Sequence, residues 1–489
     1  MTEQAVNRED TTAATESPCS PKAPTTANLR SSLSTAVARH IRFEKASFHT
    51  PGHKGRQAEL FANQGADDYL QAANDLTELP GLDDLSAPTG VLADLEARAA
   101  ALWQSQSAII SVNGATGALG AAILATASNG THALVPRNAH RSVISALCLA
   151  RLTPLWFAPA FDGEWGIWGE SDCRTIDAAL HEAVSRDCRI ACVVVVSPTY
   201  AGARSDIKAI AAVTKKHGIA LIVDEAHGAH WLSPKDRTKG AIASGADAVA
   251  HSWHKTLPAL TQTGMLHLPA GSLIDSAAAR SSISMLTSSS PNYLLLASME
   301  KTLKLLESKE NQARLQNLEA LARHFRDKLT ESGSFTSYAS GGGNNPSHLL
   351  VKSSLHEASL IYEFLQDRGI FAEAVMGAGV LFMLGLGSED IDVDLACEAL
   401  FACENLPPAT ASAFPAFLKK APAFEPLMPP HQAMLMKKES VETTQALGRI
   451  AAQCLSPCPP GIPILIPGQK ITEEVLELVS DKTILVVAQ

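Results

Sequence analysis

The chain has 489 residues, of which 46% are hydrophobic and 18% are charged, and its formal net charge is −10 at pH 7. This length exceeds what one compact core usually holds, so we expect two packed domains with the composition of a globular protein. The negative charge argues against a large phosphate-binding surface, because nucleic-acid affinity comes mainly from Lys and Arg. We therefore expect no nucleic-acid partner.

The N-terminal residues 1–30 are rich in Thr, Ala, Ser and Pro and have no apolar period, which predicts a disordered tail. No apolar run approaches the roughly 20 residues that span a bilayer, and the acidic N-terminus is atypical of a transit peptide. The nine cysteines are scattered without a Cys-x-x-Cys pair, which favours free thiols over a metal site. These features predict a cytoplasmic protein with no membrane partner.

From Leu92 the sequence alternates helical segments with short, apolar, β-branched strands. Strands of this kind predict a mostly parallel sheet that helices cover on both faces. In such sheets ligands bind at the carboxyl ends of the strands, which is where NGAT, PTYAG, DEAH and SWHK fall. The expected strands are residues 107–112, 132–136, 153–159, 190–198, 220–227 and 245–253.

A long helix is expected from about residue 293 to 329, followed by a glycine-rich break at 333–347. The pattern beyond the break predicts a smaller α+β domain. We divide the chain into a tail (1–30), an N-terminal segment (31–90), a large domain (91–330) and a C-terminal small α+β domain (331–489).

The most informative stretch is AHSWHKTLPAL, residues 250–260, where Lys255 follows a strand end. A lysine beside the hydroxyl of Ser252 suits a Schiff base with pyridoxal phosphate, whose aldehyde traps an amine. Asp224, 31 residues upstream, could pair with the pyridine nitrogen, a contact worth roughly 4 kcal/mol at about 4 Å and an effective dielectric near 20. The alternatives are a solvated surface lysine and an aspartate that caps a turn.

Two other interpretations apply to LIVDEAHGAH, residues 221–230. A helicase would need a G-x-x-x-x-G-K-[ST] phosphate loop, and no Gly-Lys dipeptide occurs in the chain. A metal cluster would need Asp224, His227 and His230 to converge, although Asp224 belongs to the strand end. A cofactor fixed at this edge uses Asp224 and His227 better, so no metal is expected here.

A second glycine-rich junction, VNGATGALG at residues 112–120, could bring backbone N–H groups and the Thr116 hydroxyl to a phosphate. In RNAHRS, His140 follows a strand end, where its imidazole could stack on a cofactor ring. A histidine satisfied within its own loop is the alternative.

The combination of motifs resembles the Orn/Lys/Arg decarboxylases, from about residue 35 to the C-terminus. The resemblance implies a pyridoxal-phosphate enzyme of fold type I, with a mostly parallel seven-stranded sheet flanked by helices and a smaller α+β domain. The motifs that carry it are FHTPGHKG (48–55), DLTELPGLDDLSAPTG (75–90), VNGATG (112–117), RNAHRS (137–142), SPTYAGARSDI (197–207), VDEAHGAH (223–230), HSWHKTL (251–257), TSSSPNYLLLASME (287–300) and CPPGIPILIPGQKI (458–471).

The resemblance also implies roles for single residues. Lys255 would hold the cofactor and Asp224 would pair with its pyridinium nitrogen, while His140 would stack on the ring and His227 would flank it. The residues expected to hold the phosphate and the lysine loop are Ala115, Thr116, Ser252 and His254.

Contacts beyond one large domain are implied as well. Ser289 matches a segment that reaches the phosphate from the neighbouring subunit, which implies a homodimer or a higher homo-oligomer. Acidic groups at the substrate entrance would suit a cationic side chain, although they could equally form a solvated face. The residues expected near that entrance are His49, His53, Lys54, Glu78, Asp83, Asp84 and Glu373.

The activity implied is decarboxylation of lysine, arginine or ornithine to cadaverine, agmatine or putrescine plus CO₂, with Lys255 or His254 returning a proton to Cα. An aminotransferase would need an arginine clamp for a second carboxylate, and no arginine stands out in that role. A non-catalytic relative would be expected to lack Lys255 or Asp224, and both are present. Ala201 and His431 depart from the common family pattern, which leaves the substrate open.

Overall fold

The structure, a computed structural model, describes residues 45–48, 83–232, 238–406, 420–457, 459–479 and 481–488. The predicted N-terminal tail and the predicted entrance residues His49, His53, Lys54 and Glu78 lie outside these ranges. Within them, no helix is both long and apolar enough to cross a membrane.

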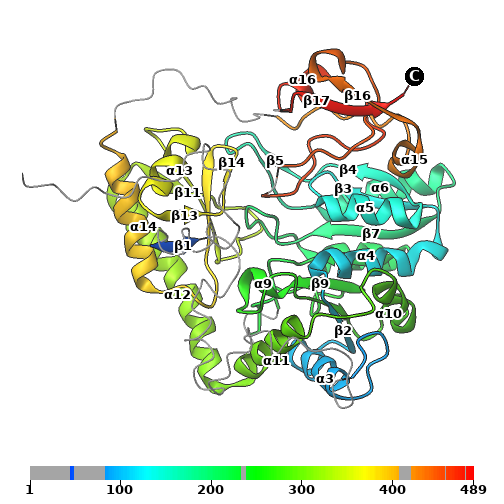
Figure 1. Cartoon of the computed structure of the whole chain (residues 1–489), viewed down its shortest axis with the longest axis horizontal. Coiled ribbons are helices and arrows are strands. Elements are labelled where there is room, and N and C mark those ends of the chain that lie inside the picture. The colour runs from blue at the N-terminus through cyan, green and yellow to red at the C-terminus, as the bar shows by residue number, and fades with distance from the viewer. Residues whose placement is uncertain are drawn as a thin grey trace, which may run out of the picture. The chain divides into compact units, whose positions relative to one another are not determined.

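The largest sheet has seven strands in the order β2-β10-β9-β8-β7-β3-β4 (Figure 1). β10 runs antiparallel to both of its neighbours, and the other neighbouring pairs are parallel. The predicted α/β fold with a mostly parallel seven-stranded sheet is therefore confirmed. The strands are β2 (Ser107–Ser111), β3 (His132–Pro136), β4 (Thr153–Phe157), β7 (Ile190–Val196), β8 (Ala220–Asp224), β9 (Ala248–Ser252) and β10 (Gly264–Leu268).

Helices cover both faces of this sheet, because its central strands are apolar on both sides. Every residue of β8 and β9 is buried, so neither face can be left to water. One face packs against α4 (Gly114–Thr126), α5 (Arg141–Ala150) and α10 (Ser276–Met285). The other packs against α6 (Cys173–Ser185), α7 (Ile207–Lys216) and α3 (Val91–Trp103).

The long helix expected over residues 293–329 is interrupted at Ser308, so that part of the prediction was wrong. α11 (Tyr293–Glu307) ends there, and α12 (Lys309–Ser332) begins after it. Ser308 has extended backbone angles (φ −76°, ψ 157°). The break has a packing cause, since the apolar face of α11 joins the core of the large sheet while most of the buried face of α12 joins the core of the smaller sheet.

The smaller sheet contains β11 (Phe335–Ser337), β12 (His348–Ser353), β15 (Gly379–Met383) and β14 (Ala374–Met376), in that order and all antiparallel. Phe48, Phe325 and Phe382 form its aromatic centre, with ring centroids 5.2 to 6.0 Å apart. The elements that complete this part are β1 (Ala46–Phe48), β13 (Ile370–Ala372), α13 (Ala358–Asp367) and α14 (Asp390–Cys403).

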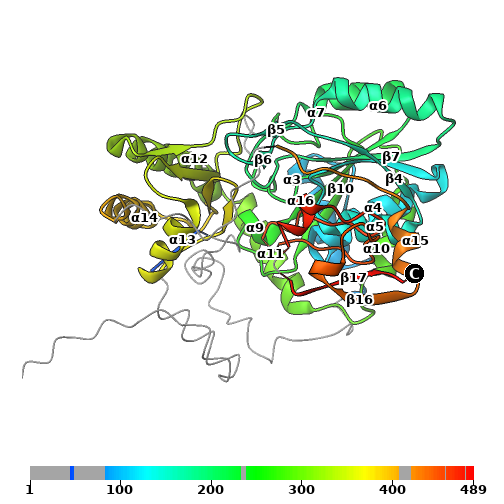
Figure 2. The same ribbon diagram turned by 90° about the horizontal axis from the view of Figure 1, so that it is seen from above.

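The C-terminal segment forms a third small core. β16 (Lys438–Glu442) and β17 (Thr483–Val487) pair antiparallel, and α15 (Pro430–Leu435) packs against α5 of the large sheet, as Figure 2 shows. Between these elements most of the described chain has no regular structure apart from two single turns, a 3-10 turn over Thr443–Gln445 and α16 (Glu473–Leu476). The domain boundaries at residues 30, 90 and 330 stay predictions.

Candidate active site

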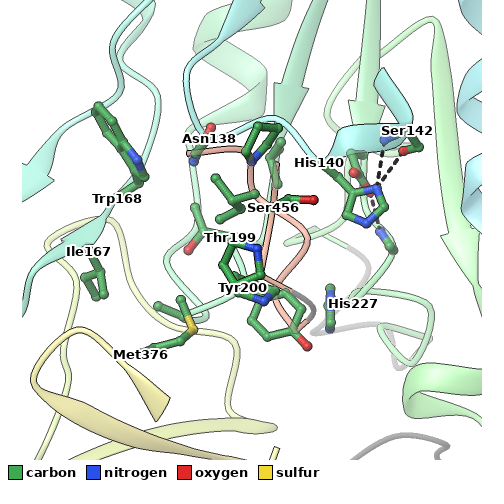
Figure 3. A pocket seen from close by; sticks show the side chains of 18 of the residues that line it. Asn138, His140, Ser142, Ile167, Trp168, Thr199, Tyr200, His227, Met376 and Ser456 are labelled. Carbon is green, nitrogen blue, oxygen red and sulfur yellow. Dashed lines mark hydrogen bonds between the residues drawn. The ribbon is translucent and has the colours of Figure 1, made fainter. Parts of the chain in front are cut away.

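A cavity of about 860 Å³ lies at the carboxyl ends of β3, β7, β8 and β9. This is the edge at which the alternating pattern predicts a ligand site. Figure 3 shows part of its lining from close by. The predicted site residues that line it are Ala115, Thr116, His140, Asp224, His227, Ser252, His254 and Lys255.

Asp224 ends β8 at the floor of the cavity and is 6% exposed. Its Oδ1 accepts a hydrogen bond from the N–H of Ala226 at 3.1 Å. Burial raises the pKa of Asp224, and Lys255, when it is protonated, opposes that rise. A buried carboxylate of this kind is stable as an anion only beside a cation or a strong donor.

Lys255 lies in α9 (Trp253–Thr256), the short helix that follows β9. Its Nζ is 2.9 Å from Nε2 of His227 and 5.8 Å from the ring centroid of Tyr200. Burial lowers the pKa of His227 well below its ordinary value, and Lys255 adds to the effect. His227 is therefore a neutral imidazole, able to accept or donate one hydrogen bond at each ring nitrogen.

Two residues of the smaller domain extend the Lys255–His227 contact into a row of hydrogen bonds. Nε2 of His348 is 3.1 Å from Nδ1 of His227, and Nδ2 of Asn345 is 2.7 Å from Nδ1 of His348. Asn345 also donates from Nδ2 to the backbone carbonyl of His227 at 3.0 Å. His348 is 2% exposed and Asn345 is fully buried. Four side chains from three segments thus form one buried hydrogen-bonded row that ends at Lys255.

His140 is the N-cap residue of α5. Its Nδ1 accepts from the backbone N–H of Ser142 at 3.1 Å and lies 2.8 Å from the Ser142 hydroxyl, as the dashed lines in Figure 3 show. Burial is the main cause that lowers the pKa of His140 to about 4, and Arg141 and the protonated form of Lys255 add to it. The capping bond fixes the ring, which stays neutral at pH 7 and can lie flat against an uncharged partner.

The opposite end of the cavity begins at the N-terminus of α4, where Gly114, Ala115 and Thr116 line it. Ser252 ends β9 beside this turn, and its Oγ accepts from the N–H of Ala115 at 3.4 Å. A helix N-terminus flanked by two hydroxyl groups is suited to a phosphate, because the first N–H groups of a helix have no partner within it.

Comparison with known proteins identifies this arrangement. Residues 31–340 match the Orn/Lys/Arg decarboxylase major domain, and residues 410–480 match the C-terminal domain of the same family. The chain belongs to the Orn/Lys/Arg decarboxylase family. It is a pyridoxal-phosphate-dependent amino-acid decarboxylase of fold type I, as the sequence motifs predict.

Relatives resemble this decarboxylase over nearly its whole length. The uncharacterised protein YaaO of Bacillus subtilis is 31% identical, with 92% of this chain and 94% of the relative aligned. An arginine decarboxylase of the same species is 30% identical over 90% and 91%. The solved lysine decarboxylase LdcF of Francisella novicida superposes with a TM-score of 0.70 at 18% identity, covering 92% and 80%, and supports the fold.

The described residues of this decarboxylase fit pyridoxal phosphate. Among them, the backbone N–H of Ala226 donates to the Asp224 carboxylate, and a pyridinium N–H would supply the strong, charged donor that this buried carboxylate needs. The first turn of α4 with Ser252 would suit the phosphate. Lys255 lies between these two ends, where a covalent attachment needs an amine.

The predicted residues Ser289, Asp83, Asp84 and Glu373 are not among the described lining residues of the cavity, and neither is His230, which was expected to lie outside the site. Ser289 is exposed in the loop before α11 and is not among the described lining residues, so its expected contact across a subunit interface stays a prediction. Asp83 accepts backbone N–H bonds at the start of α3, and although burial opposes the change, these bonds lower the pKa of Asp83 to about 2. His230 is buried outside the lining.

Several residues in or next to the cavity were not predicted as site residues, among them the lining residues Tyr200 and Met376 and, behind His227, His348. Tyr200 lies inside the PTYAG motif, and its hydroxyl donates to Glu373 of the smaller domain in a short hydrogen bond. Met376 and its neighbours add a second part of that domain to the wall (Figure 3). His348 begins an apolar strand, and nothing in the local sequence distinguishes it from a core histidine.

The C-terminal segment closes the side next to His140. Residues 455–457, 460 and 462–464 line the cavity, and the carbonyl of Gly461 accepts from the N–H of Arg141 at 2.9 Å. Gly461 has φ +74°, and a Cβ atom there would lie 2.5 Å from Nε2 of His140. Only glycine therefore permits this approach, which holds the loop against the imidazole.

Proposed function

We propose that this enzyme decarboxylates arginine, releasing CO₂ and agmatine, with lysine and ornithine as the other candidate substrates. The observation that carries the proposal is the set of reactive groups at one edge of the sheet. The amine of Lys255 contacts His227, and the carboxylate of Asp224 lines the same cavity. Arginine is placed first because a relative similar over about 90% of both chains is named an arginine decarboxylase.

The protein's own groups have separable roles in this reaction. Lys255 would hold the cofactor through its amine. Pyridoxal phosphate, when bound, would supply an electron sink for the pair of electrons that the departing CO₂ leaves behind. Asp224 would keep the proton on the ring nitrogen, and His140 would support the ring from one side. Ala115, Thr116 and Ser252 would bind the phosphate.

Two groups are placed to return a proton to Cα after CO₂ leaves. One is Nζ of Lys255, which the substrate has displaced. The other is His254, which lines the cavity and whose Nδ1 is 3.0 Å from the carbonyl oxygen of Thr263. Because a carbonyl only accepts, Nδ1 carries the hydrogen, and Nε2 is then the nitrogen that gains and loses a proton.

Recognition of the cationic side chain is assigned to the wall from the smaller domain. Tyr200 lines the cavity, and Glu373 is 8% exposed directly behind it. Because the Tyr200 hydroxyl donates its hydrogen to Glu373, its oxygen can accept a hydrogen bond from a cationic group in the cavity, and the nearby negative charge of Glu373 favours that cation.

We also propose that the enzyme works as a homodimer. The support is the exposed position of Ser289, together with its match to a family segment expected to reach the phosphate of a neighbouring subunit. Mixing a Lys255→Ala variant with a Ser289→Arg variant tests this, since a shared site would regain activity in the mixed dimer. Failure of the mixture to regain activity, with dimers confirmed by light scattering, would overturn the shared site.

The activity is tested on purified protein with arginine, lysine and ornithine as separate substrates and CO₂ as the product measured. We expect release from arginine at the highest kcat/KM, and loss of both turnover and the visible cofactor band in Lys255→Ala. Lys239→Ala, at a lysine paired with Glu319 away from the cavity, is the control. A visible band that persists with no CO₂ from any of the three amino acids would sink the proposal.

A further inference from the structure

The direction of the hydrogen bonds in the row that ends at Lys255 can be worked out from Asn345. Nδ2 of Asn345 lies 3.0 Å from the carbonyl oxygen of His227, and a carbonyl accepts only. The amide oxygen in turn accepts from the N–H of Ser347 at 3.3 Å and from its hydroxyl at 3.0 Å. Reversing the amide would break these contacts, so the nitrogen faces His348.

This orientation of the Asn345 amide determines which ring nitrogen carries the hydrogen in His348 and in His227. Nδ1 of His348 must accept from Asn345, so the hydrogen of the neutral His348 ring is on Nε2 and is donated to Nδ1 of His227. Nδ1 of His227 is then an acceptor, which leaves the hydrogen of this ring on Nε2. That nitrogen is 2.9 Å from Nζ of Lys255. A protonated lysine has no lone pair with which to accept this bond.

We propose that Asn345 and His348 are positioning residues that hold Lys255 as a neutral amine, the form that attacks an aldehyde. The inference rests on the proposed role of Lys255. Other groups act on the same amine. The carboxylate of Asp224 from β8 and the ring of Tyr200, whose centroid is 5.8 Å from Nζ, favour the charged form, whereas His140 from α5 is more easily protonated beside a neutral amine. The buried row opposes the effect of Asp224, because it directs the N–H of His227 Nε2 at Nζ of Lys255 and so favours the neutral amine.

The test reverses the direction of the hydrogen bonds in the row by a nearly isosteric substitution. In Asn345→Asp the carboxylate accepts from His348, which moves the hydrogens to the other nitrogens and makes Nε2 of His227 an acceptor for a protonated lysine. The measurement is the pH dependence of Lys255 modification by cyanate in the cofactor-free protein, followed by mass spectrometry. We expect the apparent pKa of Lys255 to rise by about one unit, the size of effect that a changed hydrogen-bond partner gives.

Asn344→Asp is the matched control, because this neighbouring amide donates to the carbonyl of Tyr338 and does not join the row. Two variants of His348 keep the proposal testable if Asn345→Asp does not fold. His348→Gln retains a donor and should keep the wild-type profile, whereas His348→Glu should raise the pKa. Equal profiles in Asn345→Asp and Asn344→Asp, or no difference between the two His348 variants, would overturn the proposal. The reaction with cyanate needs no turnover. Its result therefore tests the protonation of Lys255 even if the protein shows no decarboxylase activity.

A second, independent observation concerns the surface between α6 and the end of α7. Nε2 of His217 is 3.0 Å from Oδ1 of Asp177, and Nε2 of His181 is 3.7 Å from the same oxygen. The two imidazole rings lie 5.0 Å apart and nearly perpendicular. All three potential ligand atoms lie within 4.8 Å of one another.

We infer that Asp177, His181 and His217 form a site for a divalent transition-metal ion such as Zn²⁺. Bonds of about 2.0 to 2.1 Å to a tetrahedral ion need ligand atoms roughly 3.3 Å apart, which the observed distances reach with small movements. Two imidazoles and a carboxylate suit such an ion and leave one position for water. Lys216 opposes binding, because its Nζ lies 3.6 Å from the same Asp177 oxygen.

Lys216 makes the inference testable in both directions. Titration of the tag-free holoenzyme with Co²⁺ should give the visible bands of a tetrahedral ion. His217→Gln should weaken binding by at least about tenfold, since loss of even an outer partner of a ligand costs that much. Lys216→Gln should tighten binding several-fold, because it removes a positive charge from the site.

His324→Gln is the matched control. His324 and Lys328 contact Oδ1 of Asp394 at 3.2 and 2.6 Å, which repeats the carboxylate, imidazole and ammonium groups with one imidazole fewer. This variant should bind Co²⁺ as the wild type does. Equal affinities for the wild type and a His181→Gln/His217→Gln double variant would overturn the site, as would an unchanged affinity in Lys216→Gln.

Discussion

Two walls of the active-site cavity are built in different ways. The wall from the large sheet consists of strand ends and helix starts, where Asp224, Ser252 and the first turn of α4 occupy positions that the alternating fold dictates. The wall from the C-terminal segment is an irregular, proline-rich loop that touches His140 through Gly461. The first wall carries the groups that react, and the second sets how closely one of them is held.

The difference predicts different responses to substitution. A change in the strand-end wall should remove a chemical function and leave the shape of the cavity intact. A change in the C-terminal wall should move a group that is itself unchanged. Rates, cofactor spectra and stability separate these two outcomes.

The largest effect is expected for Asp224→Asn. Asparagine keeps the size of the side chain but lacks the charge, whose pairing with the ring nitrogen is worth about 4 kcal/mol, so kcat should fall by about a thousandfold. Cofactor absorbance and steady-state kinetics on the same sample give the measurement. Retention of more than about a tenth of the wild-type kcat would contradict the role given to this wall.

A smaller effect is expected for Gly461→Ala, which adds one methyl group to the C-terminal wall. The new Cβ would meet Nε2 and Cδ2 of His140 at 2.5 and 2.6 Å, so the loop or the ring must move. A displacement of this size should lower kcat/KM by about ten- to a hundredfold, with a changed circular dichroism of the bound cofactor.

Gly448→Ala is the control for backbone strain in that experiment. Gly448 has φ +77°, close to that of Gly461, but nothing lies within 4 Å of an added Cβ. Both variants suffer the strain of a left-handed alanine, and only Gly461→Ala contacts His140. Equal kinetics in the two variants would show that the C-terminal wall does not position the imidazole.

Glu373→Gln probes the third contributor to the cavity, the smaller domain. Loss of a charge-assisted hydrogen bond should raise KM for the cationic substrate by about tenfold with little change in kcat. Glu363→Gln, on the exposed side of α13, should leave both constants unchanged. A fall in kcat with unchanged KM would instead assign Glu373 to the chemistry.

The last effect is expected in the pH dependence of stability and not in the kinetics. Burial holds the pKa of His140 at about 4, below the value of about 6.5 in an unfolded chain. The unfolded chain therefore binds more protons between these values, and stability falls as pH decreases through that window. From about pH 7 to about pH 5 His140 should account for about 2 kcal/mol of the loss.

Thermal denaturation of wild type and His140→Gln at both pH values measures this contribution. Glutamine at the N-cap retains a side-chain acceptor for the N–H of Ser142 but does not titrate. The wild type should lose more stability than the variant on acidification. A parallel loss in both proteins would mean that His140 is not buried against the C-terminal wall in solution.

The strand-end wall could be predicted from sequence because its residues are tied to local pattern. An apolar strand followed by a polar residue places that residue at the sheet edge, so Asp224, Ser252 and Lys255 could be assigned before the fold was known. The same reasoning predicted a single helix over α11 and α12, because apolar periodicity does not show that its two halves pack into different cores.

Other site residues have no such signature. His348 begins an apolar strand, and Asn345 belongs to a glycine-rich turn more than 80 residues from Lys255. His181 and His217 lie on separate helices, and their approach to Asp177 depends on how α6 and α7 pack. Each of these contacts joins segments that are far apart in the sequence, and the sequence does not show that they lie close together in space.

The sequence by itself determined the fold class, the family and the residues that follow the strands of the large sheet. These depend on periodic burial and on motifs whose order is written in the chain. Only the tertiary structure decided that Asn345 and His348 reach Lys255 and that Gly461 reaches His140. Packing of distant surfaces selects such contacts, because each is made where two separately folded segments bury their faces together.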